Sequence, residues 1–156
     1  MPLDHTHDPA ARSWLAAANE DGCDFPVQNL PFALLRPRDS RQALRGAVAI
    51  GDQALDLAAL AATGLVDAEA APALQAAAQP TLNAFMAAGP TAWRALRHAL
   101  FALLREGAPQ QTTLRTCMLA LADVEYALPA QVGDYTDFYT SLDHARNCMR
   151  IMYPDA

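Results

Sequence analysis

The stretch GAVAIGDQALDL constrains the fold most, because it predicts a β-hairpin. Val48 and Ile50 alternate with small residues, and the alternation of apolar residues resumes at Leu55. Between the two arms, Gly51 and Asp52 suit the positive φ values that a tight hairpin turn requires. The chain is therefore expected to contain antiparallel β-structure.

The sequence after the hairpin has a helical pattern. DLAALAATG predicts a short helix that begins after the N-cap residue Asp56 and ends at Gly64. The following segment is rich in alanine, and Pro72, Pro80 and Pro90 divide it into several helices. The last of these is the most regular, with apolar residues at helical spacing: Trp93, Leu96, Leu100, Leu103 and Leu104. The expected fold class is α+β.

Composition and charge exclude several classes of protein. The chain has 156 residues, of which 53% are hydrophobic, and its formal net charge is -6. A chain of this length can bury a stable core, and its negative charge offers no broad basic surface for nucleic acid. Cys23, Cys117 and Cys148 have neither metal-binding nor disulfide spacing, and no apolar segment is long enough to span a membrane. We therefore expect a cytoplasmic protein with reduced thiols that binds neither nucleic acid nor a membrane.

The N-terminal part is expected to be largely irregular, with a short helix at residues 13–19 that Ser13 caps. His5 and His7 lie close together in LDHTHDP, but a histidine pair near a chain terminus is expected to be solvated rather than to bind a metal. His98 follows arginines on a helix and is expected to lie on the surface.

The character of the sequence changes near residues 120–130, where alanine-rich sequence gives way to aromatic and acidic residues. In the tail VGDYTDFYTSLDHARNCMRIMYPDA, Asp137 and Tyr139 are two residues apart and point the same way only if the chain is extended there. A helix is then expected to begin after Ser141 as its N-cap and to carry His144. This arrangement brings a carboxylate, a phenol and an imidazole toward one pocket.

These residue types allow two interpretations. In the functional one, Asp137 is an oxygen ligand for Ca²⁺ or Mg²⁺, Tyr139 donates a hydrogen bond to a substrate, and His144 is a general base. In the structural one, Asp137 caps a helix, Tyr139 is a core aromatic residue, and His144 lies on the surface or in a satisfied core position. An apolar stripe that includes Phe138 and Met149 is expected to face a core. Spacing alone leaves both interpretations open.

Three separated stretches resemble the fumarylacetoacetase family: DFPVQNLPFALLR, GAVAIGDQALDL and LPAQVGDYTDFYTSLDHARN. The resemblance runs from about Leu3 to Asp155, and GDYTDFY followed by a histidine is its most specific part. It implies an α+β fold, in which a small SH3-like, partly open β-barrel with several alanine-rich helices is followed by the first segment of a β-roll catalytic domain. The corresponding expected domains are residues 1–122 and residues 123–156.

The resemblance also implies roles for individual residues. Asp137 corresponds to the first carboxylate ligand of a divalent metal, Ca²⁺ or Mg²⁺, His144 to the proton acceptor, and Tyr139 to a substrate-binding residue. Tyr153 stands where the family commonly has a substrate-binding arginine, and tyrosine offers no charge to a substrate carboxylate. The implied reaction is the metal-dependent hydrolysis of the C–C bond of 4-fumarylacetoacetate to fumarate and acetoacetate, the last step of tyrosine degradation. The implied full-length protein is a homodimer.

In the family, the remaining metal carboxylates and the glutamate that orients the histidine lie further along the chain than residue 156. The chain is therefore interpreted as a fragment and is expected to be inactive alone, because one carboxylate cannot hold a cation that takes about six or more oxygens. Two alternatives stay open. One is a noncatalytic accessory or assembly module that retains the N-terminal domain, and the other is a hydrolase of a related acylpyruvate.

Overall fold

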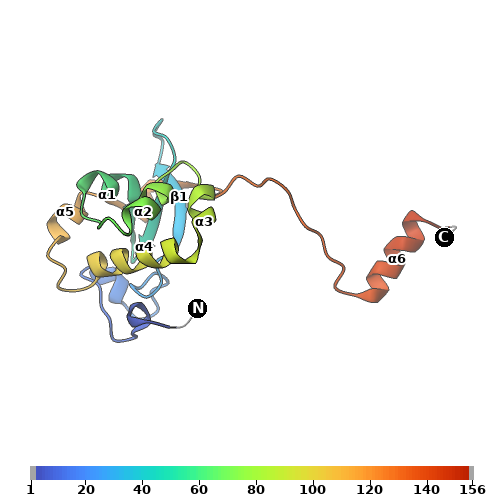
Figure 1. The fold of residues 1–156 in the computed structure, drawn as a ribbon, viewed down its shortest axis with the longest axis horizontal. Coiled ribbons are helices and arrows are strands. Elements are labelled where there is room, and N and C mark those ends of the chain that lie inside the picture. Colours follow the sequence, from blue (N-terminus) through green and yellow to red (C-terminus); the bar gives the residue numbers. More distant parts are fainter. Residues whose placement is uncertain (1–2, 155–156) are drawn as a thin grey trace.

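The computed structural model describes residues 3–154 and contains one five-stranded antiparallel sheet (Figure 1). The strands lie in the spatial order β4-β3-β2-β1-β5, and every neighbouring pair is antiparallel. The strand bounds are β1 Phe32–Pro37, β2 Arg45–Ile50, β3 Gln53–Asp56, β4 Met118–Ala120 and β5 Val124–Ala127. With the helices described next, the expected α+β class is confirmed.

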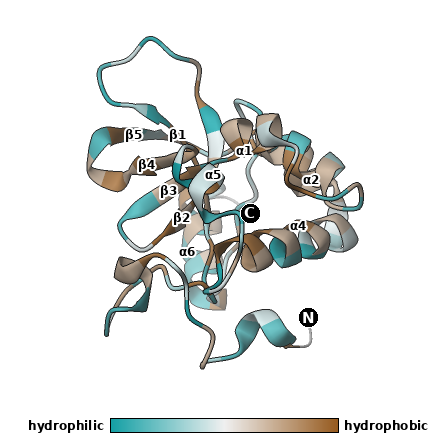
Figure 2. Cartoon of the chain, turned by 90° about the vertical axis from the view of Figure 1, so that its left-hand side faces the viewer, coloured by the Kyte–Doolittle hydropathy of each residue, from teal (hydrophilic) through white to brown (hydrophobic). Residues whose placement is uncertain are grey.

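Six α-helices and three short 3-10 helices lie within the described residues, and in Figure 2 the hydropathy colours show the apolar sides of α1, α2 and α4 turned toward the interior. The α-helices are α1 Leu57–Thr63, α2 Ala71–Ala77, α3 Asn83–Ala87, α4 Gly89–Leu104, α5 Gln111–Arg115 and α6 Leu142–Met152. The 3-10 helices are η1 His5–His7, η2 Ala16–Asn19 and η3 Leu121–Asp123. Helix α4 is the regular helix that the leucine spacing predicts.

The connection between β4 and β5 forces the sheet to curl. These strands lie at opposite edges of the sheet, yet only η3 separates them along the chain. The edges of a flat sheet with five strands would be about 19 Å apart, since neighbouring strands are spaced by about 4.8 Å. The Cα–Cα steps from Ala120 to Val124 reach about 15 Å at most. The sheet therefore bends into a half-barrel whose edges approach each other (Figure 2).

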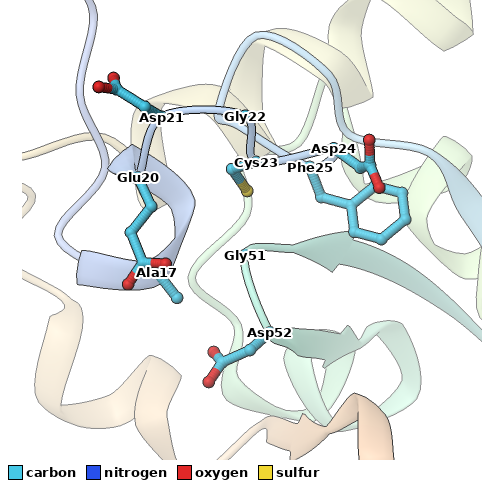
Figure 3. Close-up of a pocket in the computed structure, with 9 residues that line it drawn as sticks. All are labelled: Ala17, Glu20, Asp21, Gly22, Cys23, Asp24, Phe25, Gly51 and Asp52. Atoms are coloured by element: carbon cyan, nitrogen blue, oxygen red, sulfur yellow. The ribbon is translucent and has the colours of Figure 1, made fainter.

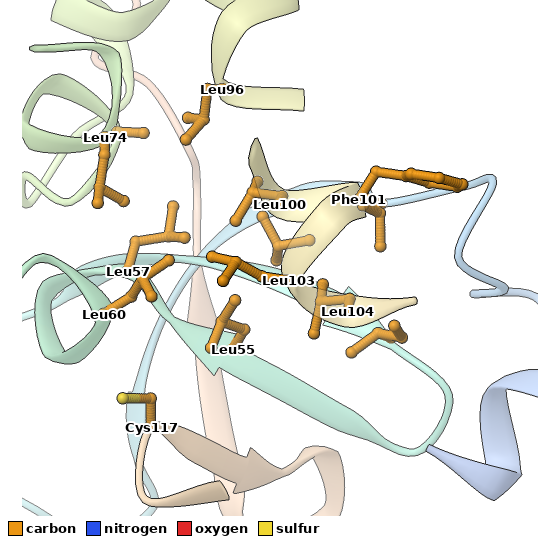
Figure 4. Packing of buried hydrophobic residues seen from close by; sticks show 14 of the residues in the cluster. Leu55, Leu57, Leu60, Leu74, Leu96, Leu100, Phe101, Leu103, Leu104 and Cys117 are labelled. Carbon is orange, nitrogen blue, oxygen red and sulfur yellow. The ribbon is translucent and has the colours of Figure 1, made fainter. Parts of the chain in front are cut away.

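Helices α1, α2 and α4 cover one face of the sheet and form the larger core with it (Figure 4). Val48, Ile50 and Leu55 enter this core from the strands. The helices contribute leucines at positions Leu57, Leu60, Leu74, Leu96, Leu100, Leu103 and Leu104. Because burial of one leucine side chain contributes about 1.5–3 kcal/mol, this layer is the main source of stability. Trp93 of the same predicted stripe is instead 39% exposed.

The opposite face of the sheet lies inside the curl and carries a smaller core. Every strand contributes one apolar side chain to it: Leu35, Ala47, Ala54, Leu119 and Val124. Along β2 and β3, the members of this inner core alternate with members of the larger core, as the two-residue period of a strand requires. Leu121 of η3 packs against the same group. The connection that closes the curl therefore also helps to fill it.

The predicted hairpin and the helix that follows it are confirmed. Strands β2 and β3 pair through Val48 and Leu55, and Gly51 in the turn has a φ of 58°. The side chain of Asp56 accepts hydrogen bonds from the first backbone N–H groups of α1, at 3.0 and 3.1 Å. Gly64 ends the helix with a left-handed φ of 69°. Local turn and capping chemistry therefore determines this whole segment.

Asp56 also joins the helix to the sheet. Its side chain is 7% exposed, and its Oδ2 lies 2.5 Å from Nε of Arg45 in β2, an ion pair without the alignment of a hydrogen bond. One carboxylate oxygen therefore caps α1 while the other holds the guanidinium of a neighbouring strand. A group with two partners in a buried position is costly to remove.

Gly46 allows the sheet and α2 to approach each other closely. A Cβ atom at this position would lie 1.7 Å from the backbone oxygen of Ala77, which is far below any van der Waals contact. The C-terminal end of α2 therefore packs directly on the backbone of β2, and a larger residue at this position would have to displace it.

The short helix predicted at residues 13–19 is confirmed in part, because only its start differs. The structure has a 3-10 helix there, which begins only at Ala16. Ser13 lies in an isolated bridge to Arg105, and its Oγ donates a hydrogen bond to the backbone oxygen of Leu104 at 2.7 Å. The same Oγ accepts the backbone N–H of Leu15 at 3.1 Å, so the hydroxyl serves both a local turn and a tertiary partner at the end of α4.

The N-terminal segment packs on α4, so His7 and His98 are less solvated than predicted, whereas His5 is exposed as expected. Nε2 of His98 lies 2.9 Å from Oδ2 of Asp4, and Nδ1 of His7 accepts the backbone N–H of Asp4 at 3.2 Å. The hydrogen bond with His98, together with hydrogen bonds from Thr6, holds the pKa of Asp4 well below its usual range. A contact between distant segments therefore determines the surroundings of His98, whereas His7 is held by a local contact with Asp4.

The three cysteines are free of disulfides, which agrees with their spacing in the sequence. Burial raises the pKa of the Cys117 thiol, so this thiol stays protonated. In the part of the chain that the structure describes, no helix has both the length and the apolar character needed to cross a membrane.

Asp56 offers a direct test of the link between helix and sheet. We expect Asp56→Ala to lower the free energy of unfolding by about 2–4 kcal/mol, because it removes the cap and leaves the Arg45 charge without its partner. Asp56→Asn keeps a capping oxygen and loses only the charge, so it should cost about half as much. Urea unfolding followed by circular dichroism measures both values. An equal loss for the two variants would contradict the role of the ion pair.

Candidate functional site

The chain leaves the sheet at the end of β5 and is held there by the beginning of α3. The backbone N–H of Leu82 donates to the oxygen of Pro129 at 2.8 Å. The side-chain amide of Asn83 accepts the backbone N–H of Gln131 at 2.9 Å and donates to the Gln131 oxygen at 3.0 Å. This pair of hydrogen bonds resembles the pairing of a neighbouring strand and fixes the direction in which the tail departs.

Beyond Gln131 the chain runs as an extended segment to Ser141 and then forms α6, well away from the sheet (Figure 1). The extended geometry and the helix that follows it are both as predicted. The prediction that the apolar stripe of the tail faces a core is wrong, because Phe138 is 77% exposed and Met149 is 49% exposed. No residue of α6 is buried. The tail therefore presents its side chains to solvent rather than to the core of the domain.

Helix α6 begins as its sequence predicts. Ser141 has extended backbone angles, and its Oγ accepts the backbone N–H of His144 at 3.3 Å. Asp143 lies in the first turn, where the positive end of the helix dipole favours a carboxylate. The cap fixes the backbone of His144 relative to the extended segment before it. This is how Tyr139 and His144, which belong to different elements, come to lie next to each other.

Tyr139, His144 and Cys148 form a small cluster at the start of α6. The ring centroids of Tyr139 and His144 are 5.4 Å apart, and Sγ of Cys148 lies 3.7 Å from Nε2 of His144. Cys148, then partial desolvation and the charge of Asp137, raise the pKa of Tyr139. A phenol with an ordinary pKa of about 10 is already protonated at neutral pH, so this shift leaves Tyr139 a hydrogen-bond donor there. Sequence reasoning assigns no role to Cys148, although its spacing of four residues from His144 on a helix is the signal that would place it there.

The other two predicted site residues, Asp137 and Tyr153, do not belong to this cluster. Asp137 is exposed in the extended segment and, among residues 3–154, belongs to no group of three or more side chains that could hold a metal. Tyr153 is the C-cap of α6 and is 57% exposed. It lies about 14 Å along the helix axis from His144, given a rise of about 1.5 Å per residue. The described residues thus bring Tyr139 and His144 together and leave the other two apart.

A separate pocket lies on the folded domain, between the loop after η2 and the hairpin turn (Figure 3). It has a volume of ≈ 320 Å³ and is lined in part by Glu20, Asp21, Asp24 and Asp52, with Cys23 near its centre. In Figure 3 the four carboxylates point in different directions rather than toward one point. The lining includes no histidine, and the carboxylates do not converge on one point, so the pocket does not reproduce the pairing of Tyr139 and His144 seen in the tail.

The curled sheet and its helices form a small α+β domain. The tail that follows it places Tyr139 beside His144 and supplies part of a polar site. The family model described as Fumarylacetoacetase N-terminal matches residues 28–129. The chain belongs to this family. The match covers all five strands and the helices α1 to α5.

Curated relatives carry the same name. The fumarylacetoacetase of Oryza sativa subsp. japonica is 43% identical over 133 residues, which cover 81% of this chain and 31% of that protein. That of Homo sapiens is 41% identical over 138 residues, covering 85% of this chain and 32% of the relative. That of Caenorhabditis elegans is 43% identical over 129 residues, covering 80% and 30%. The chain thus spans about a third of the length of the curated relatives it matches.

The cluster at the start of α6 predicts an unusual titration. Replacing Cys148 by alanine should lower the pKa of Tyr139 toward the ordinary tyrosine value of about 10, because the main cause of the shift is removed. Cys23→Ala, on the folded domain, is the matched control and should leave this pKa unchanged. NMR titration of the tyrosine Cζ signals resolves the four tyrosines of the chain. A Tyr139 pKa that is unaffected by Cys148→Ala would contradict the cluster.

Proposed function

We propose that this chain is the N-terminal part of a fumarylacetoacetase, which hydrolyses the C–C bond of 4-fumarylacetoacetate to fumarate and acetoacetate. The observation that carries the proposal is the match to curated fumarylacetoacetases at 43% identity across 81% of the chain. The adjacency of the Tyr139 and His144 rings, at a centroid distance of 5.4 Å, adds support from the tail. The proposed enzyme acts in tyrosine degradation, in the cytoplasm, as a homodimer.

The proposed roles follow the chemistry of each side chain. His144 is the general base that accepts a proton from water, and the resulting hydroxide attacks a carbonyl carbon before the C–C bond breaks. Tyr139 donates a hydrogen bond to the substrate through its phenol, which is protonated at neutral pH. Tyr153 contacts the substrate at the far end of α6, without the charge that an arginine would supply.

The proposed cofactor is Ca²⁺ or Mg²⁺, with Asp137 as one of its oxygen ligands. Such cations take about six or more oxygens, and Asp137 belongs to no ligand group among residues 3–154. The described residues therefore do not fit a complete site for this ion. For that reason we propose that the chain alone is inactive and that further carboxylates from the rest of an enzyme are required.

The proposed domains are residues 1–122 and 123–156, a division motivated by the change in composition. For the first we propose an SH3-like, partly open barrel, supported by its four short antiparallel strands, β1 to β4, and by the curl that η3 imposes on the sheet. For the second we propose the opening segment of a β-roll catalytic domain. Strand β5 belongs to the second part but pairs with β1 of the first, through Leu35 and Tyr126. The second part would thus be built onto the sheet of the first.

A noncatalytic accessory module is the second candidate, and the exposed apolar side chains of α6 favour it. Leu142 is 66% exposed and Ile151 is 80% exposed, so the helix offers a surface for a partner protein as well as for a catalytic domain. A hydrolase of a related acylpyruvate is a third candidate, for which the neutral Tyr153 is the supporting feature. Turnover of fumarylacetoacetate and of acylpyruvates by one enzyme preparation separates these candidates.

A chimera tests the proposed roles directly. In it, this chain replaces the aligned N-terminal segment of the rice relative, which supplies the downstream residues. We expect the chimera to hydrolyse fumarylacetoacetate with added Mg²⁺ or Ca²⁺, and His144→Gln to lower kcat by about 100- to 10,000-fold, as loss of a general base does. Loss of diketone absorbance measures the rate.

The tail provides matched controls for each residue. Asp134→Asn and Tyr135→Phe should leave turnover nearly unchanged, whereas Asp137→Asn and Tyr139→Phe should lower it. His7→Gln controls for removal of a histidine elsewhere. A folded chimera without activity, or one in which His144→Gln is as active as His7→Gln, would contradict the proposal.

A further inference from the structure

Asp4, His5 and His98 bring together three side chains of metal-ligating type on the folded domain, far from the tail. One possible ligand atom from each lies within 4.8 Å of those of the other two. Oδ2 of Asp4 is 2.9 Å from Nε2 of His98, and the rings of His5 and His98 meet edge to face at 4.7 Å between centroids. The two elements involved are 94 residues apart in the sequence but adjacent in the fold. No other group of three such side chains occurs in residues 3–154.

Further hydrogen bonds, to groups other than His98, hold the carboxylate of Asp4 in position. Its Oδ1 accepts hydrogen bonds from the backbone N–H of Thr6 at 3.0 Å and from the Thr6 hydroxyl at 2.7 Å. Thr6 is fully buried, and Nε of Arg97 donates to its hydroxyl at 2.9 Å. These contacts orient Oδ2 toward His98. Such outer partners are what hold ligands in place around a metal.

The group is open to solvent on one side. His5 and His98 line a surface pocket of ≈ 290 Å³ that is also lined by Asp67 and Glu69. The two additional carboxyl groups make the entrance negative, which favours a cation. His7 is not one of the three ligands, because its Nδ1 accepts the backbone N–H of Asp4 and lies 3.2 Å from Oδ1 of Asp4, which makes it an outer partner of that carboxylate.

We propose that Asp4, His5 and His98 form a binding site for a divalent first-row transition metal, with Zn²⁺ as the best match. Two imidazoles and one carboxylate suit Zn²⁺, and three protein ligands leave the fourth tetrahedral position for water. Ligand atoms at about 2.0–2.1 Å from a tetrahedral ion are about 3.3 Å apart, so the Asp4 and His98 side chains need to separate by only a few tenths of an ångström. Ca²⁺ and Mg²⁺ prefer oxygen ligands and are excluded from this role.

The bound ion fastens the N-terminal segment to α4. It replaces the hydrogen bond between Asp4 and His98 with two coordinate bonds and adds a third from His5, whose ring forms no hydrogen bond within the described residues. Binding to the folded state alone raises the melting temperature, by about 5–10 °C when free Zn²⁺ is a hundredfold above its Kd. This site is independent of the function proposed for the tail.

Cobalt absorption and thermal melting test the site in the chain as it stands. Co²⁺ at a site of two histidines and one carboxylate should give weak visible d–d bands without the intense near-ultraviolet bands of thiolate ligands, and Zn²⁺ should displace it. His98→Gln and His5→Gln should each weaken Zn²⁺ binding by about 100-fold, since loss of even an outer partner costs roughly 10- to 100-fold. His144→Gln, on the tail and away from Asp4, is the matched control and should bind within a few-fold of the unsubstituted chain.

Two results would overturn the proposal. The first is binding that depends on His5 and His7 but not on His98, which would mean chelation by a mobile N-terminal segment. The second is thiolate bands or loss of binding in His144→Gln, which would place the ion on His144 and Cys148 instead. His5 is exposed, so His5→Gln does not disturb the core and gives a result even if His98→Gln fails to fold. Absence of any Zn²⁺ effect on melting also contradicts the site.

Discussion

The short connection between β4 and β5 is the constraint on which the rest of the fold depends. Because η3 joins strands at opposite edges of the sheet, the sheet cannot be flat. The curl creates an inner face that Leu35, Ala47, Ala54, Leu119 and Val124 fill, one from each strand. Arg36 and Glu125 form an ion pair across β1 and β5, on the side where the curl closes. The outer face is left for α1, α2 and α4, whose leucines make the larger core.

The same closure determines where the tail begins. Strand β5 ends beside α3, and the amide of Asn83 holds Gln131 by two hydrogen bonds. From that point the chain has no further contact that buries its side chains, and Ser141 starts a helix by local capping alone. Tyr139 and His144 are therefore placed next to each other by the cap and not by the core. In the proposed enzyme, a catalytic domain would provide the missing burial and the missing ligands.

The sequence predicts what depends on neighbouring residues. The hairpin turn at Gly51, the caps at Asp56 and Ser141, and the stop at Gly64 all follow from side chains that act within a few residues of their own position. The resemblance to fumarylacetoacetase is confirmed at the level of the family. The domain division and the roles of Asp137, Tyr139, His144 and Tyr153 stay predictions.

The sequence does not predict what depends on distant partners. The hydroxyl of Ser13 donates to the backbone oxygen of Leu104, and His98, although still partly exposed, bonds to Asp4. The apolar stripe of α6 has the correct period but no core to cover it, because periodicity gives the face of a helix and not its partner. The segment after α5 is ambiguous from its pattern because its strands are short and pair with β3 and β1, far away in the sequence.

Amide hydrogen exchange of the chain, measured residue by residue, tests the central claim that closure through β5 organises the domain and leaves the tail outside it. The account predicts that amides in Val124–Ala127 that bond to β1 exchange as slowly as those that join β2 and β3, whereas residues 132–141 exchange at nearly the rate of an unfolded chain. Rapid exchange throughout β5, or protection of residues 132–141 equal to that of the sheet, would contradict it.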